Sequence, residues 1–284
     1  MKKVLLILMC CMAIQSVHAQ DTPKWADKAK KAVFSIVTYD KENKIKNTGN
    51  GFYIDNNGTA LSDYSLFEDA ERAVIINADG KELPVTRIAG ANSMYDVIKF
   101  RTETEKKITA LKVATQPAAV GETVYLLPYS TQKAATCQTG KVTQVDTIAD
   151  KAYYYTLTMT TSDKTVSCPI MNANGEVLGL IQKSASEEDK ESYAIGASYG
   201  ESLSISPLSA NDINLNKIGI AKALPETEDQ ALVYLYMSSS QMDAKNYLAT
   251  LNDFLQAYPN STEGYTRRAG YYMNIGDDEN NALA

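Results

Sequence analysis

The chain has 284 residues, of which 44% are hydrophobic and 22% are charged, so it is an ordinary folding sequence with room for two domains. Its 34 acidic and 28 basic residues give a net charge of −6, which removes any electrostatic basis for binding nucleic acid or anionic lipid.

The first 19 residues have the three parts of a secretory signal peptide. Two lysines precede an apolar run over residues 4–14, and Val17-His18-Ala19 forms a small-residue cleavage site before Gln20. We therefore expect an exported protein, in the periplasm or at the cell surface or outside of a bacterium. No later stretch approaches the roughly 20 apolar residues of a membrane helix, so no membrane span is expected.

A lipoprotein signal is the alternative, because Cys10 and Cys11 lie in this segment. The residues before Cys10 are Ile7-Leu8-Met9, where a lipid-attachment site needs small residues, so this alternative is disfavoured.

Removing the signal peptide also removes Cys10, Cys11 and His18, which is the only histidine. The mature chain therefore contains no imidazole, which excludes Ser-His-Asp and Cys-His catalysis. Cys137 and Cys168 remain, and in an oxidising compartment they form either a disulfide or two inert thiols.

Alanines at positions 26, 29 and 32 recur at helical spacing and predict a short helix over residues 25–31. From residue 33 to about residue 207, short β-branched and aromatic runs alternate with turns rich in Asn and Gly, which predicts a sandwich or barrels. The runs are residues 33–39, 51–54, 73–76, 97–100, 124–127, 153–159 and 177–181, and the turns are 55–58, 79–80 and 172–175.

Residues 211–227 have the character of a linker, and amphipathic helices are predicted after it. The apolar positions spaced by three and four residues are Leu232, Leu235, Tyr236, Tyr247, Leu248, Leu251, Phe254 and Leu255.

Residues 228–284 resemble tetratricopeptide (TPR) repeats of about 34 residues. The positions that carry the resemblance are Pro259, Tyr265, Ala269, Tyr272 and Gly276-Asp277. The likeness covers about one and a half repeats and departs at Asn280-Asn281. Because such repeats bury their faces only on neighbours, we expect the array to be truncated at Ala284.

Seven segments between residues 48 and 195 combine glycine-containing turns with short apolar strands in a fixed order. They are Thr48-Gly-Asn-Gly-Phe-Tyr-Ile-Asp55 and residues 58–70, 79–85, 89–100, 120–128, 168–180 and 193–195. In this order they resemble the HtrA/Deg-type trypsin-like serine proteases, whose sequence motifs include G-S-G-F-I-I-D, V-G-x-x-V-x-A-I-G-x-P and G-N-S-G-G-P-L-x-N. The resemblance implies a trypsin-like double β-barrel over residues 20–210.

The same resemblance places the family's catalytic histidine on Ser65, its aspartate on Asp96 and its serine on Val166. Only the aspartate is retained, and an aspartate orients the base without replacing it. The Gly-rich oxyanion loop is replaced by residues 164–168, whose side chains disfavour close backbone approach. We therefore expect no catalytic residues, no cofactor and no metal.

Two unconventional nucleophiles are the alternatives. Ser167 is near Lys164, as in Ser-Lys hydrolases, although an ordinary surface loop is the simpler interpretation. Cys168 needs less activation than serine, but no cationic partner that would lower its pKa is evident.

The sequence thus predicts a mainly β trypsin-like domain with a C-terminal α-helical TPR-like array. Its expected function is that of a pseudoprotease scaffold that binds protein or peptide partners. The alternatives are a serine-type endopeptidase with an unconventional site and a purely structural spacer.

Overall fold

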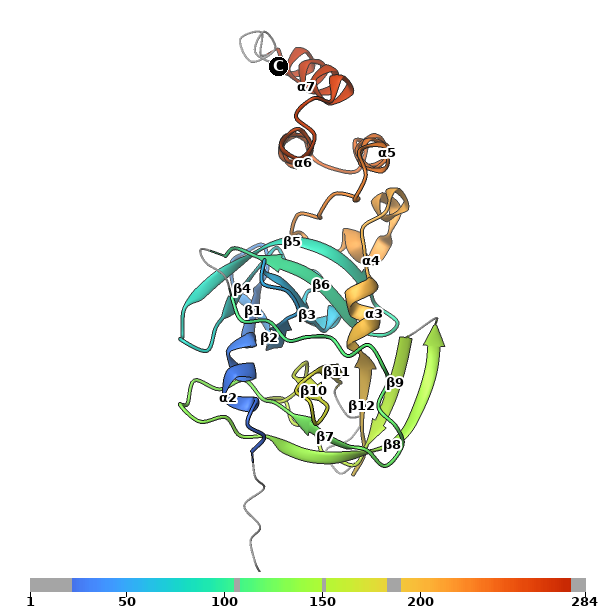
Figure 1. The fold of residues 1–284 in the computed structure, drawn as a ribbon. Helices are drawn as coiled ribbons and strands as arrows, with labels where there is room; N and C mark the ends of the chain where they lie inside the picture. Colours follow the sequence, from blue (N-terminus) through green and yellow to red (C-terminus); the bar gives the residue numbers. More distant parts are fainter. Residues whose placement is uncertain (1–21, 105–107, 150–151, 183–189, 277–284) are drawn as a thin grey trace, which may run out of the picture.

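The computed structural model describes residues 22–104, 108–149, 152–182 and 190–276, and they form two β-barrels followed by helices (Figure 1). The expected signal peptide, with Cys10, Cys11 and His18, lies outside the described residues, as do Asp277 and the rest of the C-terminal end.

The first barrel has six antiparallel strands in the order β1-β2-β3-β6-β5-β4 and is closed, so it has no free edge strand. A short helical segment precedes it, as predicted: α2 (Ala26–Ala29) and η1 (Lys30–Ala32). The strands are β1 (Val33–Tyr39), β2 (Ile45–Tyr53), β3 (Thr59–Ser62), β4 (Arg72–Ile76), β5 (Glu82–Asn92) and β6 (Val97–Thr102). Its interior is filled by aromatic side chains, among them Phe34, Phe52 and Phe100, all fully buried.

The second barrel repeats this plan with the order β10-β11-β12-β9-β8-β7. Its strands are β7 (Thr123–Leu126), β8 (Gln138–Ala149), β9 (Ala152–Leu157), β10 (Pro169–Met171), β11 (Val177–Ile181) and β12 (Ser192–Gly196), followed by α3 (Ala197–Ser202). The predicted choice between sandwich and barrels is therefore resolved as two six-stranded barrels.

The predicted turns are present and use glycine as expected. Gly58, Gly80 and Gly175 have φ values of 94°, 77° and 78°, and residues that have a Cβ atom rarely adopt such positive values. These turns set the register of the strands that flank them.

The segment predicted as a linker, residues 211–227, is instead packed on the first barrel. After η3 (Pro207–Asn211) and α4 (Ile213–Asn216), Ile218 and Ile220 are buried. The N–H of Ile88 in β5 donates to the Ala221 carbonyl at 2.8 Å, and the N–H of Ala223 donates to the Ile88 carbonyl at 2.7 Å. Burial of the isoleucines and this β-bridge explain why the segment is ordered.

Three helices follow: α5 (Glu228–Ser238), α6 (Ala244–Ala257) and α7 (Thr262–Ile275). Thr227, Asp243 and Ser261 cap their N-termini, each accepting a backbone N–H with its side chain. A small apolar cluster joins α5 to α6, and it consists of Ala231, Leu235, Leu251, Phe254 and Leu255.

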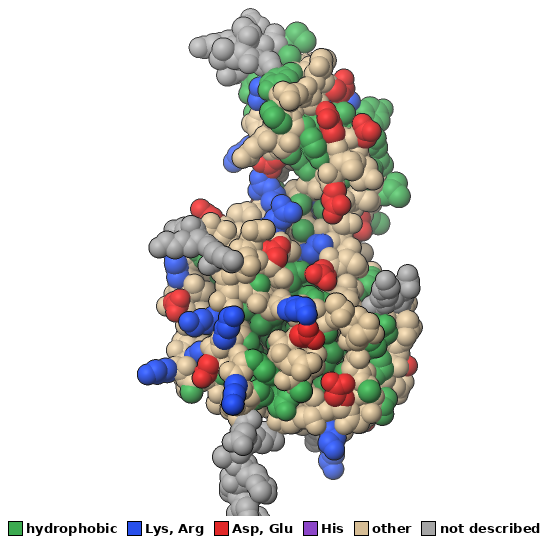
Figure 2. Space-filling view, viewed as in Figure 1, with side chains coloured by type: hydrophobic (Ala, Val, Ile, Leu, Met, Phe, Trp, Pro, Cys, Tyr) green, Lys and Arg blue, Asp and Glu red, His purple; other side chains and the backbone are tan. Residues whose placement is uncertain are grey.

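The buried face of α5 differs from the predicted one. Tyr236 was expected to face inward but is 68% exposed, whereas Tyr234 is 2% exposed and belongs to the core that is continuous with the barrels. The helix packs against α6 and also against η3, so its buried residues do not form a single amphipathic stripe. Figure 2 shows acidic and basic side chains interspersed over the face in view.

We predict that Tyr234→Ala lowers the free energy of unfolding by about 3 kcal/mol, because it leaves a large cavity between α5 and the packed segment. Limited digestion with trypsin should then cut faster at Lys217 and Lys222. Tyr236→Ala on the same helix is the matched control and should change stability by no more than about 0.5 kcal/mol. Equal effects of the two substitutions would contradict this packing.

Candidate active site

The positions that the resemblance assigns to histidine and aspartate lie against each other. Ser65 is in η2 (Tyr64–Leu66), directly after β3, and Asp96 is in the turn between β5 and β6. The Ser65 N–H donates to Asp96 Oδ1 at 2.7 Å, and Ser65 Oγ donates to Asp96 Oδ2 at 2.9 Å. Both oxygens of the carboxylate are thus engaged by one serine.

The turn over residues 162–168 holds the position assigned to the nucleophile. The Val166 N–H, which would be an oxyanion donor in a working site, donates to the Ser162 carbonyl at 3.2 Å. From β2 of the first barrel, Asn50 Nδ2 donates to the Lys164 carbonyl at 3.1 Å and to the Val166 carbonyl at 2.8 Å. The turn is therefore closed on itself and fastened to the other barrel.

Ser167 is 0% exposed and has a left-handed backbone, with φ of 64°. Its N–H donates to the Ile181 carbonyl at 2.9 Å, while its Oγ lies near the Asp63 carboxyl but has no partner with full hydrogen-bond geometry in the described part of the chain. Lys164 is exposed, so the structure does not bring a lysine and this serine into a Ser-Lys pair.

Sequence reasoning missed Asp63, which lies at the end of β3 and is 2% exposed. Burial raises the pKa of its carboxyl well above the usual value of 3.8, and the nearby charge of Asp96 adds to this, whereas the Ser167 hydroxyl lowers it in part. Asp63 Oδ1 itself accepts no hydrogen bond from the described residues. An acidic residue directly after a buried strand, two positions before Ser65, was the available signal.

Cys137 and Cys168 are both free thiols in the structure, so of the two alternatives that the sequence left open, the disulfide is absent here. The two sulfurs have different neighbours: Asp27 lies near Cys137, and Asp63 lies near Cys168. Burial raises the pKa of Cys168 to about 12 and that of Cys137 to about 11, and in each case the acidic neighbour adds to the shift. The alternative, two inert thiols, fits these surroundings.

Among the described residues, no group of three or more His, Cys, Asp and Glu side chains is arranged to hold a metal ion. Within the same residues, no helix has the length and apolar character needed to cross a membrane.

Comparison with known proteins agrees with the two-barrel architecture. Residues 49–180 match the family model of the trypsin-like peptidase domain. Among solved structures, the chain is similar to the serine endoprotease from Yersinia pestis, with 15% sequence identity and a TM-score of 0.52. That match covers 61% of this chain and 61% of the other, and identity this low shows the fold alone. No curated protein matches the sequence significantly.

The trypsin-like domain expected from the sequence is therefore confirmed over the matched residues, and the chain spans about three fifths of the length of the solved structure that it resembles.

We predict that Asp63→Asn gains stability relative to the unsubstituted chain as the pH rises. The folded-state pKa of Asp63 is raised, so the stability contributed by its neutral form is complete below about pH 3.8 and is lost as the pH rises through the folded pKa. Denaturant unfolding at pH 4, 6 and 8 measures the difference, whose slope is at most about 1.4 kcal/mol per pH unit. Asp79→Asn, in an exposed turn, is the control. A difference that is the same at all three pH values would refute a buried neutral carboxyl.

We also predict that a chain beginning at Gln20 has two titratable thiols in denaturant and none that reacts rapidly when folded. Cys168 is fully buried and Cys137 partly buried, and the raised pKa of each keeps it from forming the thiolate that attacks a disulfide reagent. Titration with such a reagent before and after adding denaturant measures this. Finding no free thiol in the denatured chain would restore the disulfide interpretation.

Proposed function

We propose that the chain is an exported pseudoprotease that binds protein or peptide segments without cleaving them. The observation that supports this proposal best is the Ser65–Asp96 pair. The N–H and the hydroxyl of Ser65 both donate to the carboxylate that would orient the imidazole in a working triad. A serine hydroxyl at this position is no general base at neutral pH.

The neighbouring turn supports the same conclusion. Val166 supplies no hydroxyl at the position assigned to the nucleophile, and its N–H is already bonded to the Ser162 carbonyl. An oxyanion hole requires N–H groups that are free to meet the developing charge. Opening this turn would also break the two hydrogen bonds from Asn50.

The two substitute nucleophiles are poorly placed for hydrolysis. Ser167 and Cys168 are both 0% exposed, so a peptide bond cannot approach either side chain without local opening. The raised pKa of Cys168 further keeps its sulfur protonated.

The binding role rests on the architecture that remains. Trypsin-like domains and TPR-like helical arrays both offer surfaces for extended or helical peptide segments. The N-terminal sequence favours export to the periplasm or the surface of a bacterium, where such a scaffold would meet envelope proteins.

One observation favours the enzyme alternative, a serine-type endopeptidase with an unconventional site. Asp63 lies beside Ser167, whose left-handed backbone resembles the strained conformation often found at functional serines. This alternative predicts cleavage that disappears in Ser167→Ala.

The test is capture from a digest of denatured envelope proteins by the immobilised chain beginning at Gln20, with bound and cleaved peptides followed by mass spectrometry. The proposal predicts saturable capture without new peptide termini. Reproducible cleavage that is lost in Ser167→Ala or Cys168→Ala would establish the enzyme instead, and the absence of saturable capture would leave the structural spacer.

A further inference from the structure

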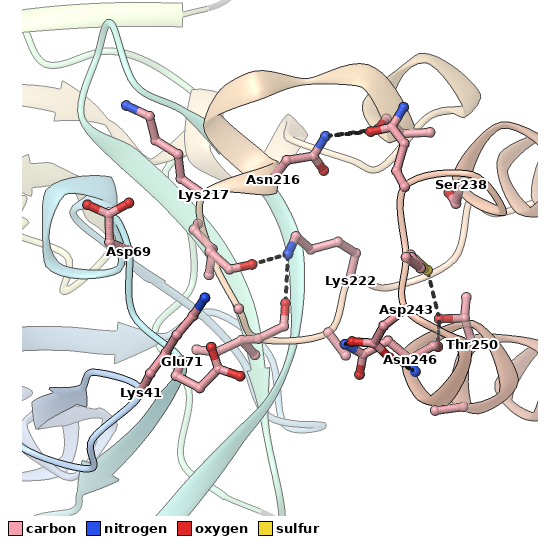
Figure 3. A pocket seen from close by; sticks show the side chains of 18 of the residues that line it. Lys41, Asp69, Glu71, Asn216, Lys217, Lys222, Ser238, Asp243, Asn246 and Thr250 are labelled. Carbon is pink, nitrogen blue, oxygen red and sulfur yellow. Dashed lines mark hydrogen bonds between the residues drawn. The ribbon is translucent and has the colours of Figure 1, made fainter.

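A polar cleft of about 830 Å³ lies between the first barrel, the packed segment and the helices α5 and α6 (Figure 3). Its volume is within the range of about 300–1,000 Å³ that is usual for ligand sites. The barrel side is formed by residues 40–42, 46, 69 and 71, the floor by residues 216–222, and the helical side by residues that include Ser238, Asp243, Asn246 and Thr250.

Contacts between the walls hold this cleft open. Arg87 on β5 forms a salt bridge with Asp253 on α6, and both side chains are about one-third exposed. The Gln241 side chain, beyond the end of α5, is hydrogen-bonded to Asn211 and Asn216 of the packed segment. Because α5 also packs against η3 and buries Tyr234 in the core that includes the barrels, these contacts form the cleft without a ligand.

The charge of the cleft selects the class of ligand. Lys217 is paired with Glu68, and Asp253 with Arg87, which leaves three lysines, at positions 41, 46 and 222, against five carboxylates. The five are Asp40, Glu42, Asp69, Glu71 and Asp243, none of which has a salt bridge within the described residues. The excess of negative charge favours a ligand with a positive group.

Lys222, which is counted in this balance, has an ammonium group that is hydrogen-bonded to the main chain. Its Nζ donates to the carbonyls of Ile218 at 2.5 Å and Ile220 at 2.8 Å (Figure 3). Burial lowers its pKa to about 8, although the charge of Glu71 acts in the opposite direction. The ammonium group is thus held against the main chain of the packed segment.

The backbone of the same segment favours a peptide over a small cation. Ala221 and Ala223 direct their main-chain groups at Ile88, so the N–H and C=O of Lys222 between them face away from β5. Neither group has a partner in the described part of the chain. An extended peptide can pair with such an edge, and the amide and hydroxyl side chains of the helical wall add further hydrogen-bonding groups.

We propose that this cleft binds an extended peptide segment that carries a lysine or arginine side chain, which would be received by Glu71, Asp69 and Asp243. This inference rests on the proposed peptide-binding function and gives it a site that is separate from the Ser65–Asp96 centre.

The test is the binding of labelled ten-residue peptides to the chain beginning at Gln20, measured by fluorescence anisotropy. Two peptides share the same apolar and Gly/Ser background, and one carries two arginines where the other carries two glutamates. The basic peptide should bind, and added salt should weaken it because the carboxylates are exposed. The variant Asp69→Asn/Glu71→Gln/Asp243→Asn should weaken it about tenfold. Asn tolerates the left-handed φ of 53° at position 69 and retains the helix cap at position 243.

The matched control Glu82→Gln/Glu103→Gln/Glu191→Gln removes three exposed carboxylates outside the cleft and should leave the affinity unchanged. Three results would each overturn the inference. They are equal affinity for the two peptides, unchanged affinity in the cleft variant, and displacement of the basic peptide by spermine with an inhibition constant equal to the dissociation constant of the peptide. If the envelope digest still yields saturable capture in that case, only this site is wrong, whereas loss of all capture removes the proposed function itself.

Discussion

The buried amide of Asn50 joins the two barrels at the point where a trypsin-like domain normally performs chemistry. Asn50 is 5% exposed, and its Nδ2 donates to two main-chain carbonyls of the turn over residues 162–168, while the main-chain carbonyl of Asn50 accepts the Ser62 hydroxyl at 2.6 Å. Buried polar groups of this kind stabilise only when they are paired, so the turn and the strand β2 fix each other. With the turn fastened in this way, the Val166 N–H bonds within the turn and Ser167 adopts its left-handed backbone.

The attachment of this turn to β2 accompanies changes at the other positions of the centre. A serine at position 65 satisfies both oxygens of Asp96 and keeps that carboxylate from being an unpaired charge. Asp63 lies deeper, beside Ser167 and Cys168, where an ionised carboxyl would be costly. The Asp96 carboxylate is therefore hydrogen-bonded on both oxygens, and the surroundings of Asp63 favour its neutral form. We propose that binding takes place elsewhere, in the cleft lined by α5 and α6.

The sequence predicted the features that depend on local pattern. The runs at residues 33–39 and 177–181 coincide with β1 and β11, and the Asn- and Gly-rich turns have the expected positive φ. It could not predict features that depend on which distant residues meet. Residues 211–227 contain Pro and Asn and suggest a linker, yet Ile218 and Ile220 pack on a barrel formed about 130 residues earlier. Strand β8 was missed because its exposed face carries Gln, Thr and Lys. Asp63 was missed because its burial requires both barrels.

Covalent labelling tests the proposed loss of catalysis most directly. The chain beginning at Gln20 would be incubated at pH 8 with an excess of a fluorophosphonate, which phosphonylates activated serines with loss of fluoride, alongside trypsin as the positive control, and intact masses would be measured. The account predicts an unchanged mass for the chain and complete modification of trypsin. A stoichiometric adduct that maps to Ser167 or Ser65, and that does not form when the chain is unfolded before labelling, would contradict it, since that serine would then be activated by the folded structure.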